Sequence, residues 1–140
     1  TEYYTNTMET YSFSDSKVKS TYGTATAKSL DDVLFTQADE DAGRGTKGEL
    51  NYRGLKYIHK EAINNQCAGI LAPSDWMYIK AGEEGTTMDS GWKTWRASVR
   101  TKCNAMQTAI DNASDVDALA ALYVRNDSGV RPLGDFPVKE

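Results

Sequence analysis

Between Gly91 and Asn112 the chain repeats large apolar residues at steps of three and four, which constrains its fold more than any other feature. The repeated residues are Trp92, Trp95, Val99, Cys103, Met106, Ile110 and Ala113. This spacing places one broad apolar stripe along a single helix. Such a stripe normally faces a hydrophobic core, so we expect the rest of the domain to pack against it. Aromatic side chains bury the largest areas, so Trp92 and Trp95 are expected to contribute most.

A second helical pattern precedes this one, from Tyr52 to Leu71. Its apolar side consists of Leu55, Ile58, Ala62, Cys67 and Ile70. We expect Pro73 to end the helix, because the residue before a proline avoids the helical region. After it the sequence predicts a turn at Ser74–Asp75, with Trp76 packing back over the helix end. A short extended piece over Met77–Ile79 and a glycine-rich linker from Ala81 to Ser90 follow.

A third helix is predicted after a break at Asn112–Asp115. Ser114 and Asp117 have the spacing of a capping box at its start. Its apolar residues are Val116, Leu119, Leu122 and Tyr123. Residues 126–140 contain two of the three prolines, so we expect an extended tail. The helical domain is therefore expected to span residues 51–125.

Residues 1–50 differ in character, because Tyr, Thr and Ser are frequent and helical periodicity is weak. Residues 7–14 alternate polar with larger side chains, which is typical of a strand. After a turn at residues 14–16, residues 17–22 are predicted to return as a second strand. An isolated hairpin is only marginally stable in water, so this arm needs something to pack on. The residues that we assign to such an assembly contact are Tyr3, Tyr4, Met8, Tyr11, Phe13, Val18 and Tyr22.

The second half of the arm is predicted to contain a short helix and a loop. Ser29 has the character of a helix cap, and one or two turns would follow through Val33, Leu34 and Phe35. Residues 38–49 contain three glycines and no large apolar residue, which is typical of a loop. The predicted fold class is therefore α+β and mostly α, with a three-helix carboxyl-terminal domain after an extended, β-like arm.

The sequence shows no motif for catalysis, for a metal or for a cofactor. His59 is the only histidine, and no second histidine or paired-cysteine motif could complete a zinc site with it. We expect it to be a partly exposed helix residue. Asp39–Asp41 lacks the spacing of a calcium loop, and Gly43–Gly48 lacks that of a phosphate-binding loop. We therefore predict that the protein is not an enzyme and uses no cofactor.

Charge and hydropathy limit the classes of partner. A net charge of −4 argues against nucleic acid as the main partner. No apolar run approaches the ~18 residues that suggest a membrane span. For Cys67 and Cys103 two alternatives remain. We favour a reduced, buried pair over a disulfide, which would need an oxidising compartment and suitable geometry.

Two short motifs resemble those of a known family. Ser74-Asp75-Trp76 follows the first long helix, and Trp92-x-x-Trp95-Arg96-x-x-Val99-Arg100 follows the linker. Across roughly residues 53–112 they resemble the tail assembly chaperone-like domain of tailed bacteriophages. Such domains carry Ser/Thr-Asp-Trp and then Trp-x-x-Tyr-Arg-x-x-Leu-Arg. Here Trp95 stands at the tyrosine position and Val99 at the leucine position.

Arg96 and Arg100 lie four residues apart and so share one face of their helix. In one interpretation Asp75 pairs with one of them, which would explain why the two motifs occur together in the family. In the other they form a docking face, because arginine beside tryptophan is typical of interface hot spots. We favour the structural interpretation.

The resemblance implies a role in a tailed bacteriophage. We expect a non-enzymatic structural protein of the virion, bound to the tail, the baseplate or the tail fibres. Its partners would be other tail or fibre proteins, with multiple copies in a symmetric assembly and with neither nucleic acid nor a membrane involved. An arm with so little local structure is typical of a segment that neighbours order. We therefore prefer a resident of the virion tail, made in the host cytoplasm.

Two alternatives to this function stay open. One is a tail or tail-fibre assembly chaperone that is absent from the mature particle. The other is a host-recognition binding module, which the Tyr-, Ser- and Gly-rich composition would suit.

Overall fold

A computed structural model describes all residues from 1 to 140, which divide into two compact units, residues 1–55 and 56–140. Helices hold 44% of the chain and strands 14%, with the short strands in the first half. The predicted class, α+β and mostly α, is therefore confirmed.

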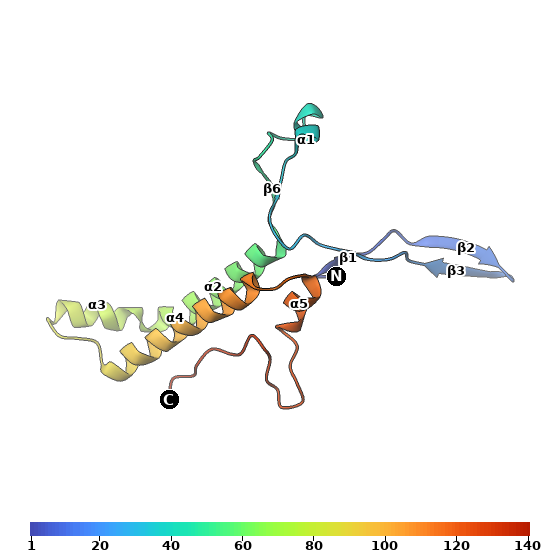
Figure 1. The fold of residues 1–140 in the computed structure, drawn as a ribbon. Coiled ribbons are helices and arrows are strands. Elements are labelled where there is room, and N and C mark those ends of the chain that lie inside the picture. Colours follow the sequence, from blue (N-terminus) through green and yellow to red (C-terminus); the bar gives the residue numbers. More distant parts are fainter. The chain divides into compact units, whose positions relative to one another are not determined.

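The first unit contains one long, interrupted β-hairpin. Strands β2 (Thr10–Ser14) and β3 (Lys17–Thr21) pair next to the turn, and β1 (Tyr4–Thr5) pairs with β4 (Thr26–Ala27). From the Tyr4–Ala27 pair to the Ser14–Lys17 pair, each residue further along the first strand faces one residue earlier in the second strand. Both ladders therefore share one register. Figure 1 shows β2 and β3 as the paired arrows of this hairpin.

Asp15 and Ser16 form the tip of the hairpin, as the sequence predicts. Their φ angles are 49° and 58°, and positive φ at both central residues is the mark of a type I′ turn. This turn matches the right-handed twist of the two strands. The strand bounds differ slightly from the prediction, since β2 begins at Thr10 rather than Thr7 and β3 ends at Thr21 rather than Tyr22.

The rest of this unit consists of β5 (Val33–Leu34), α1 (Gln37–Asp41) and β6 (Leu50–Tyr52), with β5 and β6 antiparallel. The helix predicted over residues 33–35 is therefore wrong. The loop predicted over residues 38–49 is wrong for residues 38–41, which belong to α1, and is confirmed for residues 42–49. Thr36, not Ser29, caps the helix. Its hydroxyl accepts from the Asp39 N–H while the Asp39 carboxylate accepts from the Thr36 N–H. This reciprocal capping box supports a helix that has no buried residue.

Asp32 holds the end of the first unit. Its carboxylate accepts from Arg53 Nη1 at 2.6 Å and from the Gly54 N–H at 2.8 Å. A Cβ atom at Gly54 would collide with the backbone of Leu30 and Asp31. Glycine is therefore required at position 54 because two stretches of backbone pass so close together.

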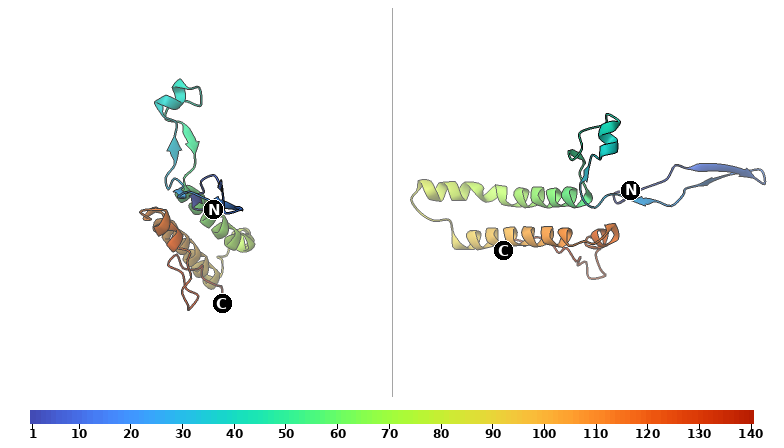
Figure 2. Two further views of the ribbon diagram at one scale, coloured as in Figure 1. Left: turned by 90° about the vertical axis from the view of Figure 1, so that its right-hand side faces the viewer. Right: turned by 45° about the horizontal axis from the view of Figure 1, so that its top comes forward.

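The second unit is built on a helical hairpin. Its elements are α2 (Leu55–Leu71), the 3₁₀ turn η1 (Ala72–Ser74), α3 (Asp75–Glu83), α4 (Ser90–Asp111) and α5 (Val116–Ala121). Helices α2 and α4 lie side by side and antiparallel (Figures 1 and 2). Lys60 Nζ meets Asp111 Oδ1 at 2.8 Å near one end, and Arg96 Nη1 donates to the Leu71 carbonyl at 2.8 Å near the other.

Helix α3 corrects the prediction for the segment after Pro73. Met77–Ile79 is helical rather than extended, and α3 includes the first residues of the predicted linker. Pro73 lies in the first turn of η1, where its missing N–H costs no helical hydrogen bond. Asp75, in the first turn of α3, is favoured by the helix dipole. The helical part therefore contains α3 in addition to the three predicted helices.

The core of the second unit is centred on the predicted stripe of α4. The buried apolar side chains of α2, α4, α5 and the tail include Ile63, Cys67, Val99, Cys103, Met106, Ile110, Val116, Leu119 and Leu133. The stripe is confirmed from Val99 onward, but Trp92 and Trp95 are only half-buried. Asp115, not Ser114, caps α5, because the Asp115 carboxylate accepts from the Ala118 N–H at 2.7 Å.

The buried face of α2 differs from the predicted face. His59, Ile63 and Cys67 are buried at steps of four, whereas Ile58 and Ala62 are exposed. His59 Nδ1 lies 2.8 Å from the Tyr123 hydroxyl, and the two ring centroids are 5.0 Å apart. A hydrogen-bond partner inside the protein makes a buried polar side chain tolerable. The prediction of a partly exposed His59 is therefore wrong.

The tail, residues 126–140, has no helix or strand but is attached to the unit. Leu133 is buried, and its N–H donates to the Leu122 carbonyl at 3.0 Å. Arg125 pairs with Asp135 through both terminal nitrogens, at 2.9 and 2.8 Å. The tail is therefore part of the second unit.

Candidate functional site

The two family-like motifs meet where α2 ends and α3 begins. Arg96 of α4 is 8% exposed and donates from Nη1 to the Leu71 carbonyl and to the Ser74 hydroxyl. Its Nη2 lies 2.5 Å from Asp75 Oδ1. The predicted contact between Asp75 and one of the two arginines is therefore confirmed, with Arg96 as the partner.

This contact holds the junction between the helices. The Leu71 carbonyl lies at the end of α2, where carbonyls lose their helical partners, and Arg96 and Ser74 both donate to it at 2.8 Å. Asp75 is 57% exposed, so its ion pair with Arg96 is partly screened by water. The buried hydrogen bonds of Arg96 therefore do most to hold the junction of α2 and α3. The planar guanidinium can donate to Leu71, Ser74 and Asp75 at the same time.

Trp92 and Trp95 contact the carboxyl-terminal tail. Their rings meet edge to face, with centroids 5.5 Å apart and planes at 88°. Trp95 Nε1 donates to the Pro137 carbonyl at 3.0 Å, and Lys139 Nζ lies 5.3 Å from the Trp92 ring centroid. Trp76 is 54% exposed and does not pack over the end of α2, contrary to the prediction.

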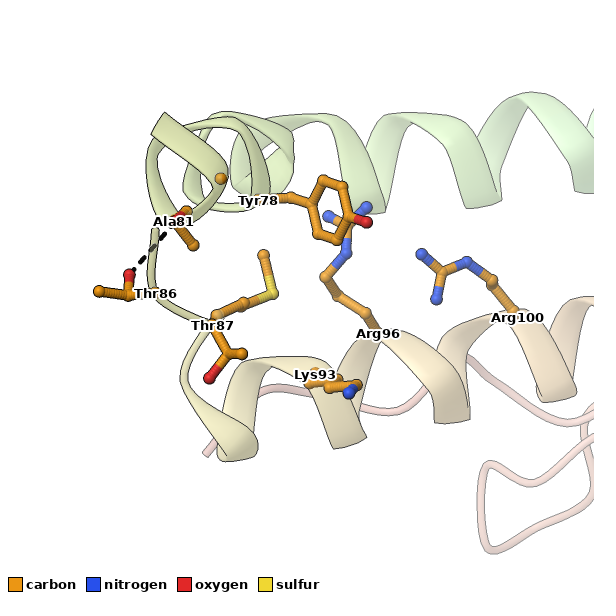
Figure 3. A pocket seen from close by; sticks show the side chains of 9 residues that line it. Tyr78, Ala81, Thr86, Thr87, Lys93, Arg96 and Arg100 are labelled. Carbon is orange, nitrogen blue, oxygen red and sulfur yellow. Dashed lines mark hydrogen bonds between the residues drawn. The ribbon is translucent and has the colours of Figure 1, made fainter. Parts of the chain in front are cut away.

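Arg100 takes no part in the junction and instead lines a pocket beside it. The pocket has a volume of about 430 Å³, and its lining residues are Tyr78, Ala81, Gly82, Thr86, Thr87, Met88, Lys93, Arg96 and Arg100. In Figure 3 the Arg96 and Arg100 side chains extend from α4 toward the facing helices, and the Tyr78 ring lies beside Arg96. The Thr86 hydroxyl donates to the Ala81 carbonyl at 3.3 Å.

The sequence analysis missed this pocket because it predicted no helix at α3. The only signal was the spacing of Lys93, Arg96 and Arg100, which places three cations on one side of α4. Tyr78 and Ala81 line the pocket opposite these cations. They lie on one side of the chain only because residues 75–83 are helical.

The β2–β3 ribbon of the first unit is amphipathic. Its register sets Phe13 opposite Val18 and Tyr11 opposite Ser20, which places Tyr11, Phe13 and Val18 on one face. Their exposed fractions are 68%, 76% and 69%. The other face carries Thr10, Ser12, Ser14, Lys17, Lys19 and Thr21.

The remaining arm residues fall into two groups. Met8 and Tyr22, in the unpaired stretches between the two ladders, are exposed. Tyr4 in β1 and the preceding Tyr3 are half-buried. The Tyr11 hydroxyl donates to the Glu9 carboxylate at 2.6 Å, which raises the pKa of Tyr11. The ribbon face made by Tyr11, Phe13 and Val18 is thus the part of the predicted arm contact in which exposed apolar side chains lie together on paired strands.

The remaining side chains show a reduced cysteine pair and no metal centre. No group of three or more His, Cys, Asp or Glu residues is placed to hold a metal ion. Cys67 and Cys103 are free and buried. Burial, with a smaller contribution from the neighbouring Cys103, raises the pKa of the Cys67 thiol and so favours its neutral, unreactive form. No helix has the length and hydropathy of a membrane span.

Comparison of the chain with protein-family models, with curated proteins and with solved structures gives no match. The geometry of the ribbon and of the helical unit is therefore the basis for a function, together with the two short motifs.

Proposed function

We propose that the protein is a non-enzymatic structural component of a tailed-bacteriophage virion, located in the tail, the baseplate or the tail fibres. The observation that carries the proposal is the β2–β3 ribbon, in which every residue is exposed. This ribbon is the assembly element, and the helical unit is the body that it attaches to neighbouring proteins.

The ribbon lacks what a two-stranded sheet needs to be stable alone. Two strands without a packed face are marginal in water, and here the apolar face is uncovered. Burying one large apolar side chain contributes roughly 1.5–3 kcal/mol, so covering Tyr11, Phe13 and Val18 would add more than the ribbon gains by itself. The outer edges of β2 and β3 also offer backbone groups to which a neighbour's strand can add.

The phage assignment draws on the two motifs. Ser74, Asp75 and Arg96 form one hydrogen-bonded junction, so the residues shared with the tail assembly chaperone-like family act together. Its partners would be tail or fibre proteins, repeated in a symmetric assembly, and the protein would be made in the host cytoplasm and retained in the virion.

The same junction favours a second candidate function. A tail or tail-fibre assembly chaperone would use the same helical body, bind its client through the ribbon and leave before the particle is complete. The two candidate functions differ only in whether the protein remains in the mature virion. A host-recognition module has no specific contact in its favour.

The test combines particle proteomics with a face-specific variant. In purified virions we expect the protein at a fixed stoichiometry. The variant Tyr11→Ser/Phe13→Ser/Val18→Ser should keep the helical circular dichroism of the parent yet fail to incorporate. The matched control Ser12→Asn/Lys17→Gln/Lys19→Gln changes the opposite face and should incorporate normally. Abundant protein in infected lysate with none in finished particles would support the chaperone, and normal incorporation of the first variant would exclude the ribbon as the assembly element.

A further inference from the structure

We propose that the pocket lined by Lys93, Arg96 and Arg100 binds a carboxylate side chain from an acidic segment of a partner protein. This site lies in the second unit and involves none of the ribbon residues. It goes beyond the function proposed above and does not depend on it.

The three cations differ in how they are held. Arg96 is fixed by its contacts with Leu71, Ser74 and Asp75, so its charge has a set position in the pocket lining. Lys93 and Arg100 line the same pocket, and their side chains make no hydrogen bond or ion pair within the protein. Their donors are available to a ligand, and a fixed guanidinium beside them reduces the ordering that binding would require.

The electrostatics of the pocket favour an anion. No Asp or Glu lines it, although the whole chain carries a net charge of −4. Asp75 offsets part of the Arg96 charge from the junction side, which leaves Lys93 and Arg100 uncompensated. The Asp89 carboxylate caps the start of α4 by accepting from the Gly91 and Trp92 N–H groups, so the positive charge of the pocket comes from its side chains and not from the helix dipole. An anion would relieve the repulsion among these like charges.

The lining of the pocket suits a carboxylate side chain of a partner protein. A guanidinium matches a planar carboxylate with two parallel hydrogen bonds. Thr87 supplies a hydroxyl and Met88 supplies apolar surface, whereas the Thr86 hydroxyl already donates to the Ala81 carbonyl. A second hollow shares Ala81, Thr86, Thr87 and Met88 with the first, and Trp76 and Trp92 give it apolar surface for the residues that flank the carboxylate. It also carries two acids, of which Glu84 pairs with Lys80 at 3.6 Å and Asp89 caps α4.

Binding can be measured by calorimetry with the full chain and a short acidic probe. The probe is acetyl-Gly-Glu-Asp-Glu-Gly-amide, and its control replaces the acids with Gln and Asn. We expect the acidic peptide to bind and the neutral one not to bind. The affinity should fall as salt rises from about 50 to about 300 mM, since exposed charges are screened.

A matched pair of variants locates the site. Lys93→Glu/Arg100→Glu should weaken binding of the acidic peptide by at least about tenfold, because charge-assisted hydrogen bonds are replaced by repulsion. Lys28→Glu/Lys47→Glu changes the net charge equally in the first unit and should leave the affinity within about twofold. If the charge reversal impairs folding by circular dichroism, Lys93→Gln/Arg100→Gln replaces it, with the same direction expected.

Several outcomes would overturn the proposal. No binding of the acidic peptide at low salt would do so, as would equal losses in the two variants. If inorganic phosphate displaces the peptide at equal concentration, the pocket is a general anion site and not a protein-docking site. Tighter binding of a short oligothymidylate would instead assign it to nucleic acid. The Tyr11→Ser/Phe13→Ser/Val18→Ser variant should bind the peptide normally, so failure of this site and failure of the ribbon can be told apart.

Discussion

The two units of the chain are stabilised in opposite ways. The helical unit buries one continuous set of apolar side chains, in which Val99, Ile110 and Leu119 have no exposed surface. The hairpin of the first unit is held by its register and its turn, and its large side chains face solvent. A unit with a core can keep its fold alone, whereas a ribbon without one depends on what covers it. We therefore assign assembly to the ribbon and support to the helical unit.

The largest expected effect comes from breaking the helical core. Ile110→Ala should destabilise the protein by about 2–5 kcal/mol, because it removes transfer free energy and leaves a cavity. The helical signal should melt earlier in thermal circular dichroism, while the NMR shifts of residues 10–21 stay in place. Thr108→Ala, on the exposed side of α4, is the control and should change stability by less than about 0.5 kcal/mol. Loss of both units together would contradict this separation.

A smaller effect is expected at the Arg96 junction. Arg96→Met keeps most of the apolar stem but leaves the Leu71 carbonyl and the Ser74 hydroxyl without this donor. The expected cost is about 1–3 kcal/mol in urea denaturation. Arg100→Met removes the same charge from a side chain without internal partners and should be nearly neutral. Equal costs for the two would mean that Arg96 has no special structural role.

The ribbon offers a test in the opposite direction. Ser16→Gly removes the cost of positive φ at the second turn residue and should stabilise the hairpin by roughly 1 kcal/mol. Cross-strand NOEs between Phe13 and Val18 should strengthen, while the melting of the helical unit stays unchanged. Weaker NOEs would show that the turn does not set the register. This variant also gives a ribbon of higher intrinsic stability for incorporation assays.

The smallest effect concerns the pH dependence of α1. Hydrogen bonds from the Thr36 hydroxyl and N–H, followed by Arg44, lower the pKa of Asp39 to about 2 from an ordinary value of 3.8. A carboxylate with a lowered pKa stabilises the fold above its unfolded pKa and loses that contribution as pH falls through the folded value. Stability from this cap should therefore be complete above pH ~4 and disappear toward pH ~2. Carboxyl NMR titration should place the Asp39 midpoint near 2, and Thr36→Val should return it toward 3.8.

Local patterns were sufficient to predict several elements. The stripe from Val99 to Ile110 repeats over about three turns, so the helix and its buried side followed from the spacing alone. The hairpin followed from alternation around a polar Ser14–Ser16 turn. Both are short-range features, in which neighbouring residues decide the backbone conformation.

Other elements required contacts between distant residues. Sequence placed a stop at Pro73, but the chain continues as η1 and α3 because Arg96, more than twenty residues later, supplies donors to Leu71, Ser74 and Asp75. The sequence predicted a partly exposed His59, but in the structure it is buried and contacts the Tyr123 hydroxyl. Trp92 and Trp95 were predicted to be core residues, but they contact the carboxyl-terminal tail instead.

What the sequence by itself determined is the set of periodic and turn-coded elements: α4, the approximate extent of α2, the hairpin and the mostly helical class. Only the tertiary structure decided which arginine meets Asp75, which face of α2 is buried, and that Lys93, Arg96 and Arg100 share a pocket with Tyr78. The physical reason is that periodicity fixes where side chains point around one helix. The register of one helix against another depends on packing and hydrogen bonds between residues far apart in the chain.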